Sequence, residues 1–181
     1  MNTVLLVCTA NRCRSVMAEA MLSARFTARG ATVTVASAGL LGAGQRPPAE
    51  VVTVLADRGM HVAGYRSRQL TAADLAGADL VLGLGREHVR HCAVLQPDAW
   101  ARAFTLRELV RRGAQAGPRG PGEPLASWLA RAAAGRSRRD LLGRAPQDDV
   151  ADPFGGPLAG YRAAAGLLDQ LTRDLVALGW G

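Results

Sequence analysis

The sequence predicts an α/β fold, a three-layer sandwich in which helices cover both faces of a central four-stranded parallel sheet. Two observations lead to this prediction. Short apolar or β-branched runs alternate along the chain with segments of helical pattern. The first of these runs, residues 4–7, is apolar without a break, which is typical of a parallel strand buried on both faces.

Four segments have the pattern of strands. Residues 4–7 form a continuous apolar run, and residues 32–36 are rich in β-branched side chains. Residues 79–84 give a third strand, and Ala103 with Phe104 lies in a short fourth one. We expect Ser37, Ala38 and Gly39 to begin the loop after the second strand.

Helices are expected between the strands and at the end of the chain. Ser15 stands at the position of an N-cap, ahead of a helical pattern that starts at Val16. Two prolines, Pro47 and Pro48, open a helix over residues 49–58, and Gly59 ends it. Pro157 starts the last helix, which runs to about Leu178.

Two capping boxes mark further helix starts. Thr71 is followed by Asp74 at the third helical position, and Thr105 is followed by Glu108 in the same way. Between them, residues 86–95 have a helical pattern that ends before Pro97.

Residues 114–147 differ in character from the rest of the chain. Glycine and proline dominate residues 117–122, which indicates a linker, and residues 127–134 can form a short helix. We therefore predict a single domain over residues 1–181, with a partly mobile surface insertion at 114–147 that decorates a loop rather than forming a binding element.

The charge of the chain does not by itself indicate a nucleic-acid partner. The net charge is +7, but every one of the 22 basic residues is arginine, and most are dispersed. This pattern is better explained by a compositional bias, although a basic surface would favour anionic substrates. No apolar run is long enough to span a bilayer and the N-terminus lacks a signal-peptide pattern, so we predict a cytoplasmic protein with no membrane partner.

Cysteine and histidine are too few to indicate a disulfide framework or a metal site. Three cysteines are an odd number, and no Cys-x-x-Cys pair is present. His88, His91 and Cys92 could lie near one another on a helix, but no carboxylate stands in an obvious place beside them. We predict a structural or surface role for these residues, and neither metal nor cofactor.

The loop over residues 8–15 carries the clearest chemical signal. It reads Cys-Thr-Ala-Asn-Arg-Cys-Arg-Ser and joins the first strand to the first helix, at the sheet edge where α/β proteins bind ligands. Backbone N–H groups of such a loop can converge on a phosphate, helped by the helix dipole. The predicted phosphate-binding residues are Thr9, Ala10, Asn11, Arg12, Cys13, Arg14 and Ser15.

Within this loop, two residues have the chemistry of a phosphoryl-transfer site. Arg14 can bind two phosphate oxygens with its forked guanidinium. Cys8, at the base of the loop, can act as a thiolate nucleophile stabilised by the same donors, and the Ser15 hydroxyl is placed to donate to it. The Cys-x5-Arg spacing alone would arise by chance roughly one time in three, and Cys8 could be a buried strand-end residue. The strand and helix that flank the loop strengthen the functional interpretation.

The reaction also needs a residue that supplies a proton. Attack on phosphorus expels an alkoxide or phenoxide, and hydrolysis of the resulting phosphocysteine needs a base. Asp152, next to Pro153, is the candidate for both tasks. It could also be an ordinary turn aspartate, and Asp148 and Asp149 are competing candidates.

At this point the chain resembles the low-molecular-weight protein-tyrosine phosphatases. The matching stretches are residues 4–20, 37–39, 67–71, 79–82 and 152–155, in the order of the family. The resemblance implies Cys8 as nucleophile, Arg14 as phosphate clamp, Asp152 as general acid and then base, and no metal or cofactor. It also implies Asn11 and Ser15 as organisers of the loop. Cys13 matches a family cysteine that can pair reversibly with the nucleophile under oxidation, or it is a small buried residue.

Three departures from the family bear on the substrate. Arg12 stands where the family has an apolar residue or threonine, and it could reach an acidic substrate or point outward. The loop around Leu41 lacks the aromatic residue that stacks on phosphotyrosine in the family. Phe154 remains as an aromatic wall, so the predicted substrate walls are Arg12, Leu41 and Phe154. The third departure is the segment 114–147.

These residues predict a metal-independent hydrolase that acts through a phosphocysteine, with phosphotyrosine in proteins as its first substrate. A phosphoarginine or small-molecule phosphatase is the alternative, although the related arginine phosphatases carry threonine in place of Arg12. An arsenate reductase would need a relay pair of cysteines, and only Cys92 lies beyond the loop. A non-catalytic phosphoprotein-binding module would need neither Cys8 nor Asp152. The expected partner is thus a phosphorylated protein or a small phosphate ester, and the oligomeric state is left open.

Overall fold

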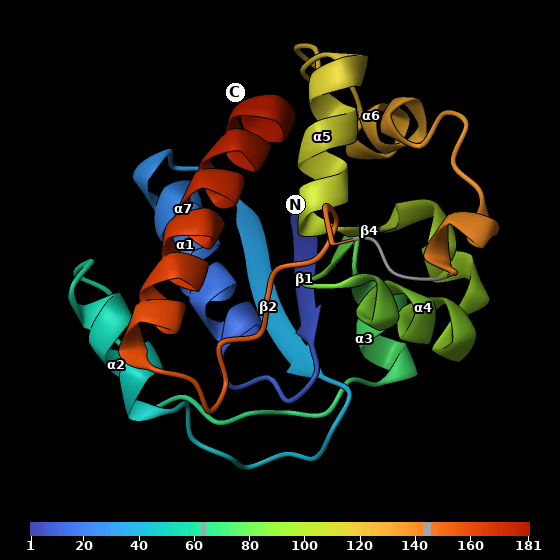
Figure 1. The fold of residues 1–181 in the computed structure, drawn as a ribbon. Coiled ribbons are helices and arrows are strands. Elements are labelled where there is room, and N and C mark those ends of the chain that lie inside the picture. Colours follow the sequence, from blue (N-terminus) through green and yellow to red (C-terminus); the bar gives the residue numbers. More distant parts are fainter. Residues whose placement is uncertain (63, 143–145) are drawn as a thin grey trace.

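The sheet at the centre of the protein has four parallel strands in the order β2-β1-β3-β4. The structure is a computed structural model that describes residues 1–62, 64–142 and 146–181. The strands are β1 (Asn2–Cys8), β2 (Val33–Gly39), β3 (Leu80–Gly83) and β4 (Ala103–Thr105). Helices lie on both faces of this sheet, which confirms the predicted α/β sandwich (Figure 1).

The helices divide between the two faces. The α-helices are α1 (Arg14–Ala28), α2 (Ala49–Ala56), α3 (Ala72–Gly77), α4 (Arg86–Leu95), α5 (Leu106–Ala116), α6 (Leu125–Ala132) and α7 (Leu158–Trp180). Two 3-10 helices, η1 (Pro97–Arg102) and η2 (Arg138–Leu141), join them. Helices α1, α2 and α7 lie on one side of the sheet, and α3 and α4 lie on the other (Figure 1).

Strand β1 supplies both halves of the core. Val4, Leu6 and Cys8 face the cluster that α1, α2, α5, α6 and α7 complete. Leu5 and Val7 face the second cluster, which includes residues of α3, α4 and η1. Successive strand side chains point to opposite faces, so the unbroken apolar run has the burial that a central parallel strand requires.

Strand β2 extends further than the sequence pattern predicts. Ser37, Ala38 and Gly39 were expected to begin a loop, but they continue the ladder opposite β1, with Gly39 beside Cys8. Small residues have little strand propensity of their own. Pairing with the central strand decides their conformation, and it brings β2 to the base of the loop that follows β1.

Helix starts were predicted with mixed success. The capping boxes of Thr71 with Asp74 and of Thr105 with Glu108 are both present. The prediction for Ser15 is wrong, because α1 already begins at Arg14 and its N-cap position makes no side-chain cap. The Ser15 hydroxyl instead contacts Cys8, as described below.

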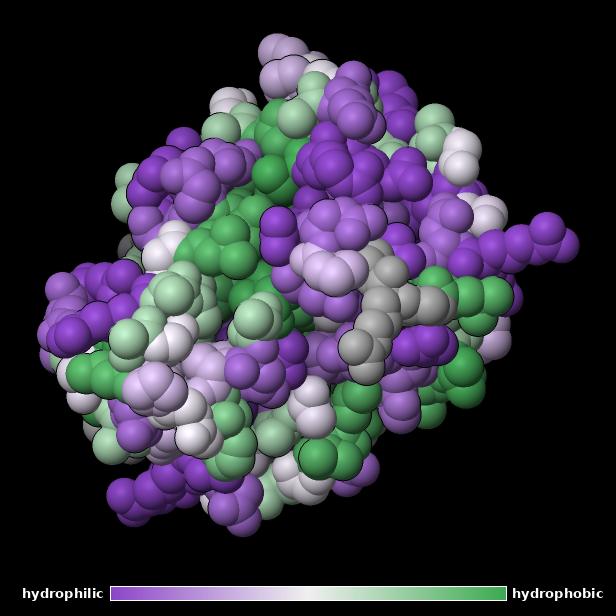
Figure 2. Space-filling model, in the orientation of Figure 1, coloured by the Kyte–Doolittle hydropathy of each residue, from purple (hydrophilic) through white to green (hydrophobic). Residues whose placement is uncertain are grey.

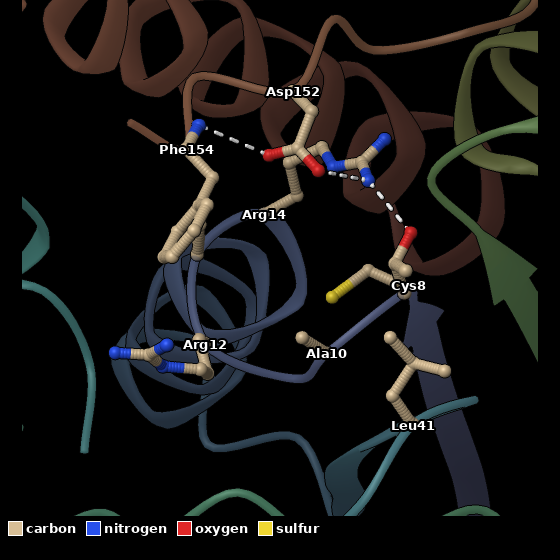
Figure 3. Close-up of a pocket in the computed structure, with 9 residues that line it drawn as sticks. Cys8, Ala10, Arg12, Arg14, Leu41, Asp152 and Phe154 are labelled. Carbon is tan, nitrogen blue, oxygen red and sulfur yellow. Dashed lines mark hydrogen bonds and ion pairs between the residues drawn. The ribbon is translucent and has the colours of Figure 1, made fainter. Parts of the chain in front are cut away.

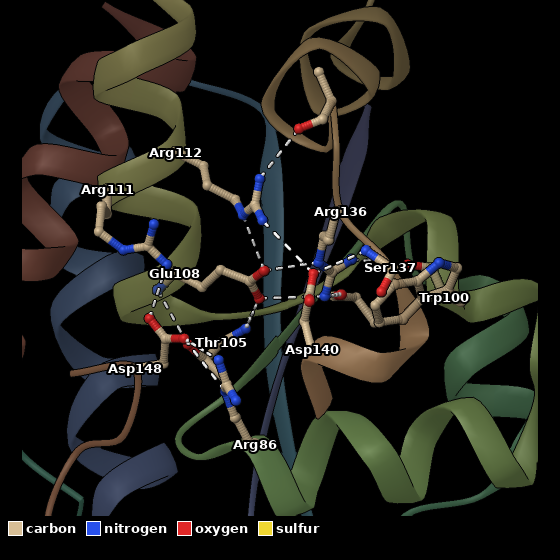
Figure 4. A network of polar contacts seen from close by, with 12 residues as sticks. Arg86, Trp100, Thr105, Glu108, Arg111, Arg112, Arg136, Ser137, Asp140 and Asp148 are labelled. Atoms are coloured by element: carbon tan, nitrogen blue, oxygen red, sulfur yellow. Dashed lines mark hydrogen bonds and ion pairs between the residues drawn. The ribbon is translucent and has the colours of Figure 1, made fainter. Parts of the chain in front are cut away.

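The described part of residues 114–147 contributes to the core. Trp128 of α6 is fully buried, and its Nε1 donates to the carbonyl of Gly117 at 3.0 Å. Arg136 lies over the rings of Trp100 and Phe104, at 3.8 and 4.1 Å from their centroids. Its Nε also donates to Glu108 at 2.7 Å (Figure 4). The description of this segment as an insertion stays a prediction, but its tryptophan lies in the core rather than on the surface.

One face of the molecule carries a band of hydrophobic residues along α7, beside the segment that precedes this helix (Figure 2). A shallow hollow there is lined by Val150, Pro153, Ala164 and Leu167, among others. Within the described residues, none of the helices has both the length and the apolar character needed to cross a bilayer.

Replacing Trp128 tests whether α6 belongs to the cooperative unit. Trp128→Ala should lower the free energy of unfolding by about 3–5 kcal/mol, because it leaves a large cavity in a packed core. Val94→Ala, at a side chain that is 79% exposed, should change this free energy by less than about 0.5 kcal/mol. Chemical denaturation measures both free energies of unfolding. A change in Trp128→Ala as small as that in Val94→Ala would show that α6 unfolds independently of the core.

Candidate active site

A pocket of about 230 Å³ opens at the carboxyl end of β1. It is lined by Cys8, Thr9, Ala10, Arg12, Cys13, Arg14, Leu41, Asp152 and Phe154. Figure 3 shows Arg14 and Asp152 on one side of the pocket and Leu41 on the other, with the Cys8 sulfur between them. The structure thus brings together segments from the start, the first quarter and the end of the chain.

The turn of the loop depends on Asn11, which has a positive φ of 52°. Its side-chain amide donates to Ser15 Oγ at 3.0 Å and to Ser37 Oγ at 2.7 Å. Its Oδ1 accepts from the backbone N–H of Arg68 at 2.9 Å. These hydrogen bonds hold a left-handed conformation that asparagine tolerates better than most residues.

A second layer of polar side chains supports Asn11. Ser37 Oγ donates to Glu19 Oε2 at 2.5 Å and lies 2.7 Å from the hydroxyl of Tyr65. Burial raises the pKa of Glu19, and it raises the pKa of Tyr65 to about 12. The sequence pattern does not indicate a role for Glu19 or Tyr65, because folding alone brings these two residues to the loop. The Ser-Ala-Gly stretch at 37–39 was the available signal.

Gly39 allows β2 to pass directly beneath the loop. A Cβ at this position would lie 2.7 Å from the backbone nitrogen of Asn11, which is too close for any side chain. Immediately after Gly39, the N–H groups of Leu40 and Leu41 donate to the carbonyls of Cys8 and Thr9 at 3.1 and 2.9 Å. These bonds place Leu41 at the pocket wall.

The two loop cysteines have different environments. Cys8 Sγ lies 3.0 Å from the hydroxyl of Ser15, a contact that would stabilise a thiolate if the hydroxyl donates. Burial, with a further contribution from Asp152, raises the pKa of the Cys13 thiol to about 12. Cys13 is therefore a thiol at neutral pH, and both cysteines are unbridged in this structure.

Arg14 connects the loop to the opposite side of the pocket. Its Nη2 donates to Asp152 Oδ2 at 2.7 Å and to Thr9 Oγ1 at 3.1 Å, and its Nη1 donates to the carbonyl of Val150 at 3.1 Å. The guanidinium is almost fully buried, and its Nε has no hydrogen-bond partner among the described residues. An anionic ligand in the pocket could supply that partner.

The structure separates the three candidate acids. Asp148 is buried and pairs with Arg86 at 2.9 Å and with Arg111 at 3.0 Å (Figure 4). Asp149 accepts a hydrogen bond from the backbone N–H of Arg86, at the start of α4. Of the three, Asp152 lines the pocket, and 44% of its side chain is exposed. Asp148 and Asp149 are anchors of the segment that carries Asp152.

The remaining wall is formed by Arg12 and Phe154. The Arg12 guanidinium lies over the Phe154 ring, 5.1 Å from its centroid, and Arg12 Nε donates to the carbonyl of Arg46 at 2.9 Å. The Phe154 N–H donates to Asp152 Oδ1 at 3.2 Å (Figure 3). A positive charge therefore stands beside the aromatic wall of the pocket.

His88 lies directly behind the loop, in a place that its sequence position did not reveal. Its ring is fully buried, and its Nε2 lies 3.1 Å from Thr9 Oγ1. Burial, followed by the nearby charge of Arg14, lowers the pKa of His88 to about 3, so the ring is neutral at physiological pH. His91 is exposed, and no metal-binding cluster of histidine, cysteine or acidic side chains occurs within the described residues. The buried face of α4, which also carries Val89 and Cys92, was the available signal.

Comparisons with known proteins agree with this geometry. Residues 3–118 match the model of a protein family that is described as low molecular weight phosphotyrosine protein phosphatase. The chain is similar to a protein-arginine-phosphatase of Geobacillus stearothermophilus, with 31% identity over 95% of this chain and 92% of that protein. It is also similar to the low molecular weight protein-tyrosine-phosphatase Etp of Escherichia coli, with 35% identity over 61% of this chain and 73% of Etp.

Among solved structures, the chain is similar to the low molecular weight protein tyrosine phosphatase from T. tengcongensis. The TM-score is 0.74 and the identity is 30%, over 97% of this chain and 98% of that one. The likeness therefore extends through both the loop that follows β1 and the C-terminal segment that carries Asp152.

The buried neutral ring of His88 should make stability depend on pH. Because the His88 pKa is about 3 in the folded protein and about 6.5 in the unfolded chain, the unfolded state binds the extra proton first as pH falls. His88 should thus cost about 2 kcal/mol of folding free energy between pH 7 and pH 5. His88→Gln should lose correspondingly less stability over this interval in denaturant titrations.

The matched control is His91→Gln, on the exposed face of the same helix. It should keep the full pH dependence of the wild-type protein. Parallel pH profiles for His88→Gln and the wild type would contradict a neutral, desolvated His88.

Proposed function

The chain belongs to the low molecular weight phosphotyrosine protein phosphatase family, and we propose that it hydrolyses phosphorylated side chains of proteins through a phosphocysteine intermediate on Cys8. The observation that carries this proposal is the meeting of Cys8, Arg14 and Asp152 in one pocket. A thiol, a buried guanidinium and an accessible carboxyl group are the nucleophile, the phosphate clamp and the proton carrier that such a reaction requires.

The first step transfers the phosphoryl group to the enzyme. The oxygens of the phosphoryl group receive hydrogen bonds from the loop and from Arg14. At Arg14 these oxygens compete with the Asp152 carboxylate for the guanidinium N–H groups. Cys8 Sγ attacks phosphorus, the S–P bond forms, and the bond to the leaving oxygen or nitrogen breaks. Asp152, in its protonated form, gives its proton to that leaving atom.

The second step releases phosphate. A water molecule attacks the phosphocysteine while the Asp152 carboxylate takes one of its protons. The S–P bond breaks, inorganic phosphate leaves, and the sulfur of Cys8 departs as a thiolate. The hydroxyl of Ser15, 3.0 Å from this sulfur, stabilises the leaving thiolate.

Phosphoarginine in proteins is the substrate that the comparisons support better. The arginine phosphatase is similar to this chain over nearly the full length of both, whereas Etp matches over 61% of this chain. The pocket wall at Leu41 is aliphatic and exposed, so it offers no aromatic face for a phosphotyrosine ring. A planar guanidinium can stack on Phe154, as Arg12 does in this structure.

Phosphotyrosine is the second candidate. The tyrosine phosphatase from T. tengcongensis matches this chain over nearly the full length of both, and Phe154 can pack against a phenyl ring. The positive charge of Arg12 beside the pocket would also repel the guanidinium of phosphoarginine.

Substitutions of Cys8 and Asp152 test the reaction itself. Cys8→Ser should abolish hydrolysis of p-nitrophenyl phosphate, because a serine hydroxyl is not ionised at neutral pH. Asp152→Ala should lower kcat by about 10²–10⁴, with a larger effect on phenyl phosphate, whose leaving group needs the proton more. Steady-state assays measure both effects, and turnover by Cys8→Ser at the wild-type rate would exclude the phosphocysteine.

Asp149→Ala is the control for the acid. Its side chain accepts a bond from the start of α4 and does not line the pocket, so kcat should fall by less than about tenfold. A larger loss in Asp149→Ala than in Asp152→Ala would overturn the assignment of Asp152.

Two peptides of identical sequence, one with phosphoarginine and one with phosphotyrosine, test the substrate. We expect the higher kcat/KM for phosphoarginine. Arg12→Thr should raise the preference for phosphoarginine by about fivefold to tenfold, because it removes a repulsion of roughly 1 kcal/mol from the pocket wall. Arg46→Thr, where only the backbone carbonyl contacts Arg12, should leave the ratio unchanged.

A higher kcat/KM for the phosphotyrosine peptide would select the second candidate. An unchanged ratio in Arg12→Thr would show that Arg12 does not influence substrate choice.

A further inference from the structure

The hydroxyl of Thr9 contacts two buried side chains, Arg14 at the wall of the pocket and His88 behind it. Arg14 Nη2 lies 3.1 Å from Thr9 Oγ1, and His88 Nε2 lies 3.1 Å from the same oxygen. Both side chains are buried, and Thr9 and Arg14 line the pocket together with Cys8. The Thr9 oxygen therefore has a fixed position between the protein interior and the pocket.

The surroundings of His88 indicate which ring nitrogen carries the hydrogen. Nε2 lies 3.3 Å from Glu87 Oε1, and a bare nitrogen lone pair so close to a carboxylate oxygen would be repelled by it. Nδ1 is buried without a partner among the described residues, and a hydrogen on it would be left unbonded. The tautomer with hydrogen on Nε2 satisfies both conditions, and we infer from it that His88 donates to Thr9.

This arrangement leaves one direction for the Thr9 proton. A hydroxyl group has two acceptor lone pairs and one O–H donor. Arg14 and His88 occupy the two lone pairs, so the hydrogen cannot point toward either of them. The pocket that Thr9 lines is where a ligand oxygen could receive it.

We propose that Thr9 is a further substrate-contacting residue, whose hydroxyl donates a hydrogen bond to the bound phosphoryl group, and that His88 is the positioning residue that orients it. This inference rests on the proposed phosphatase reaction and adds a side-chain donor to the backbone and to Arg14. His88 suits this task because its buried ring is neutral: it donates from Nε2 without placing a second cation beside Arg14.

Binding of inorganic phosphate by Thr9 variants is the first test. Thr9→Val removes the hydroxyl at nearly constant shape, and it should raise the Ki of inorganic phosphate by about 10- to 100-fold, the loss expected for a hydrogen bond to a charged group. Thr9→Ser should restore tight binding. Thr9→Ala is a second hydroxyl-free variant, and circular dichroism melting confirms that each variant is folded.

A double-mutant cycle tests the role of His88. His88→Leu should raise the Ki of phosphate, and His88→Gln, which keeps an N–H donor, should restore most of the affinity. The double variant Thr9→Val/His88→Leu should bind phosphate no more weakly than Thr9→Val, because His88 acts through the hydroxyl that is already absent. Nitrogen-15 NMR of the imidazole should show the hydrogen on Nε2.

Several results would overturn the proposal. Thr9→Val that binds phosphate as tightly as the wild type, while Cys8-dependent turnover persists, would remove the Thr9 contact and leave the phosphatase reaction intact. Equal losses of phosphate affinity in Thr9→Ser and Thr9→Val would show that the Thr9 hydroxyl does not bind the phosphate. Additive effects of Thr9→Val and His88→Leu on the Ki of phosphate, or a hydrogen on Nδ1 of His88, would remove the role of His88. A wild-type protein that neither binds nor releases phosphate would overturn both this inference and the proposed function.

Discussion

The guanidinium of Arg14 joins two segments that lie more than 130 residues apart in the chain, with Thr9 on one side and Val150 and Asp152 on the other. A buried cation is costly unless charge and hydrogen bonds compensate it. Each of these contacts therefore stabilises Arg14 and also fixes the distance across the pocket. The same interaction that permits this arginine to be buried places the Cys8 thiol, the Arg14 guanidinium and the Asp152 carboxyl group around one small volume. Helix α1 contributes as well, since it begins at Arg14 and directs its N-terminus at the same point.

The segment that carries Asp152 is anchored independently of Arg14. Asp148 binds arginines from α4 and α5, and the Val150 N–H donates to the carbonyl of Leu84 after β3 at 2.9 Å. Arg107 donates to the carbonyl of Asp149 at 3.0 Å. These contacts tie the segment to the sheet edge, so the position of Asp152 does not depend on its ion pair with Arg14 alone. In the proposed reaction the Asp152 carboxyl group first gives and then takes a proton, a role that needs this combination of fixed backbone and accessible side chain.

The sequence was sufficient where local pattern decides structure, and insufficient where distant packing does. Apolar runs and capping boxes predicted the strands and most helix starts, and the 8–15 motif predicted residues that line the pocket. Ser15 was assigned as a cap because serine favours that position, but contacts with Cys8 and Asn11 determine its orientation. The prediction of a surface insertion at 114–147 rests on the glycine and proline residues at 117–122, and it does not reveal that Trp128 packs into the core. His88 carries no motif, and its place behind Thr9 arises only when α4 packs against β1.

The central claim is that the phosphoryl group resides on Cys8 during turnover. Rapid quenching of Asp152→Ala with p-nitrophenyl phosphate tests it most directly, because the good leaving group permits the first step while the missing base slows the second. Peptide mapping by mass spectrometry, under conditions that preserve the S–P bond of phosphocysteine, should then locate one phosphoryl group on the peptide that contains Cys8. A phosphoryl group on any other residue, or turnover without an adduct on Cys8, would contradict the account.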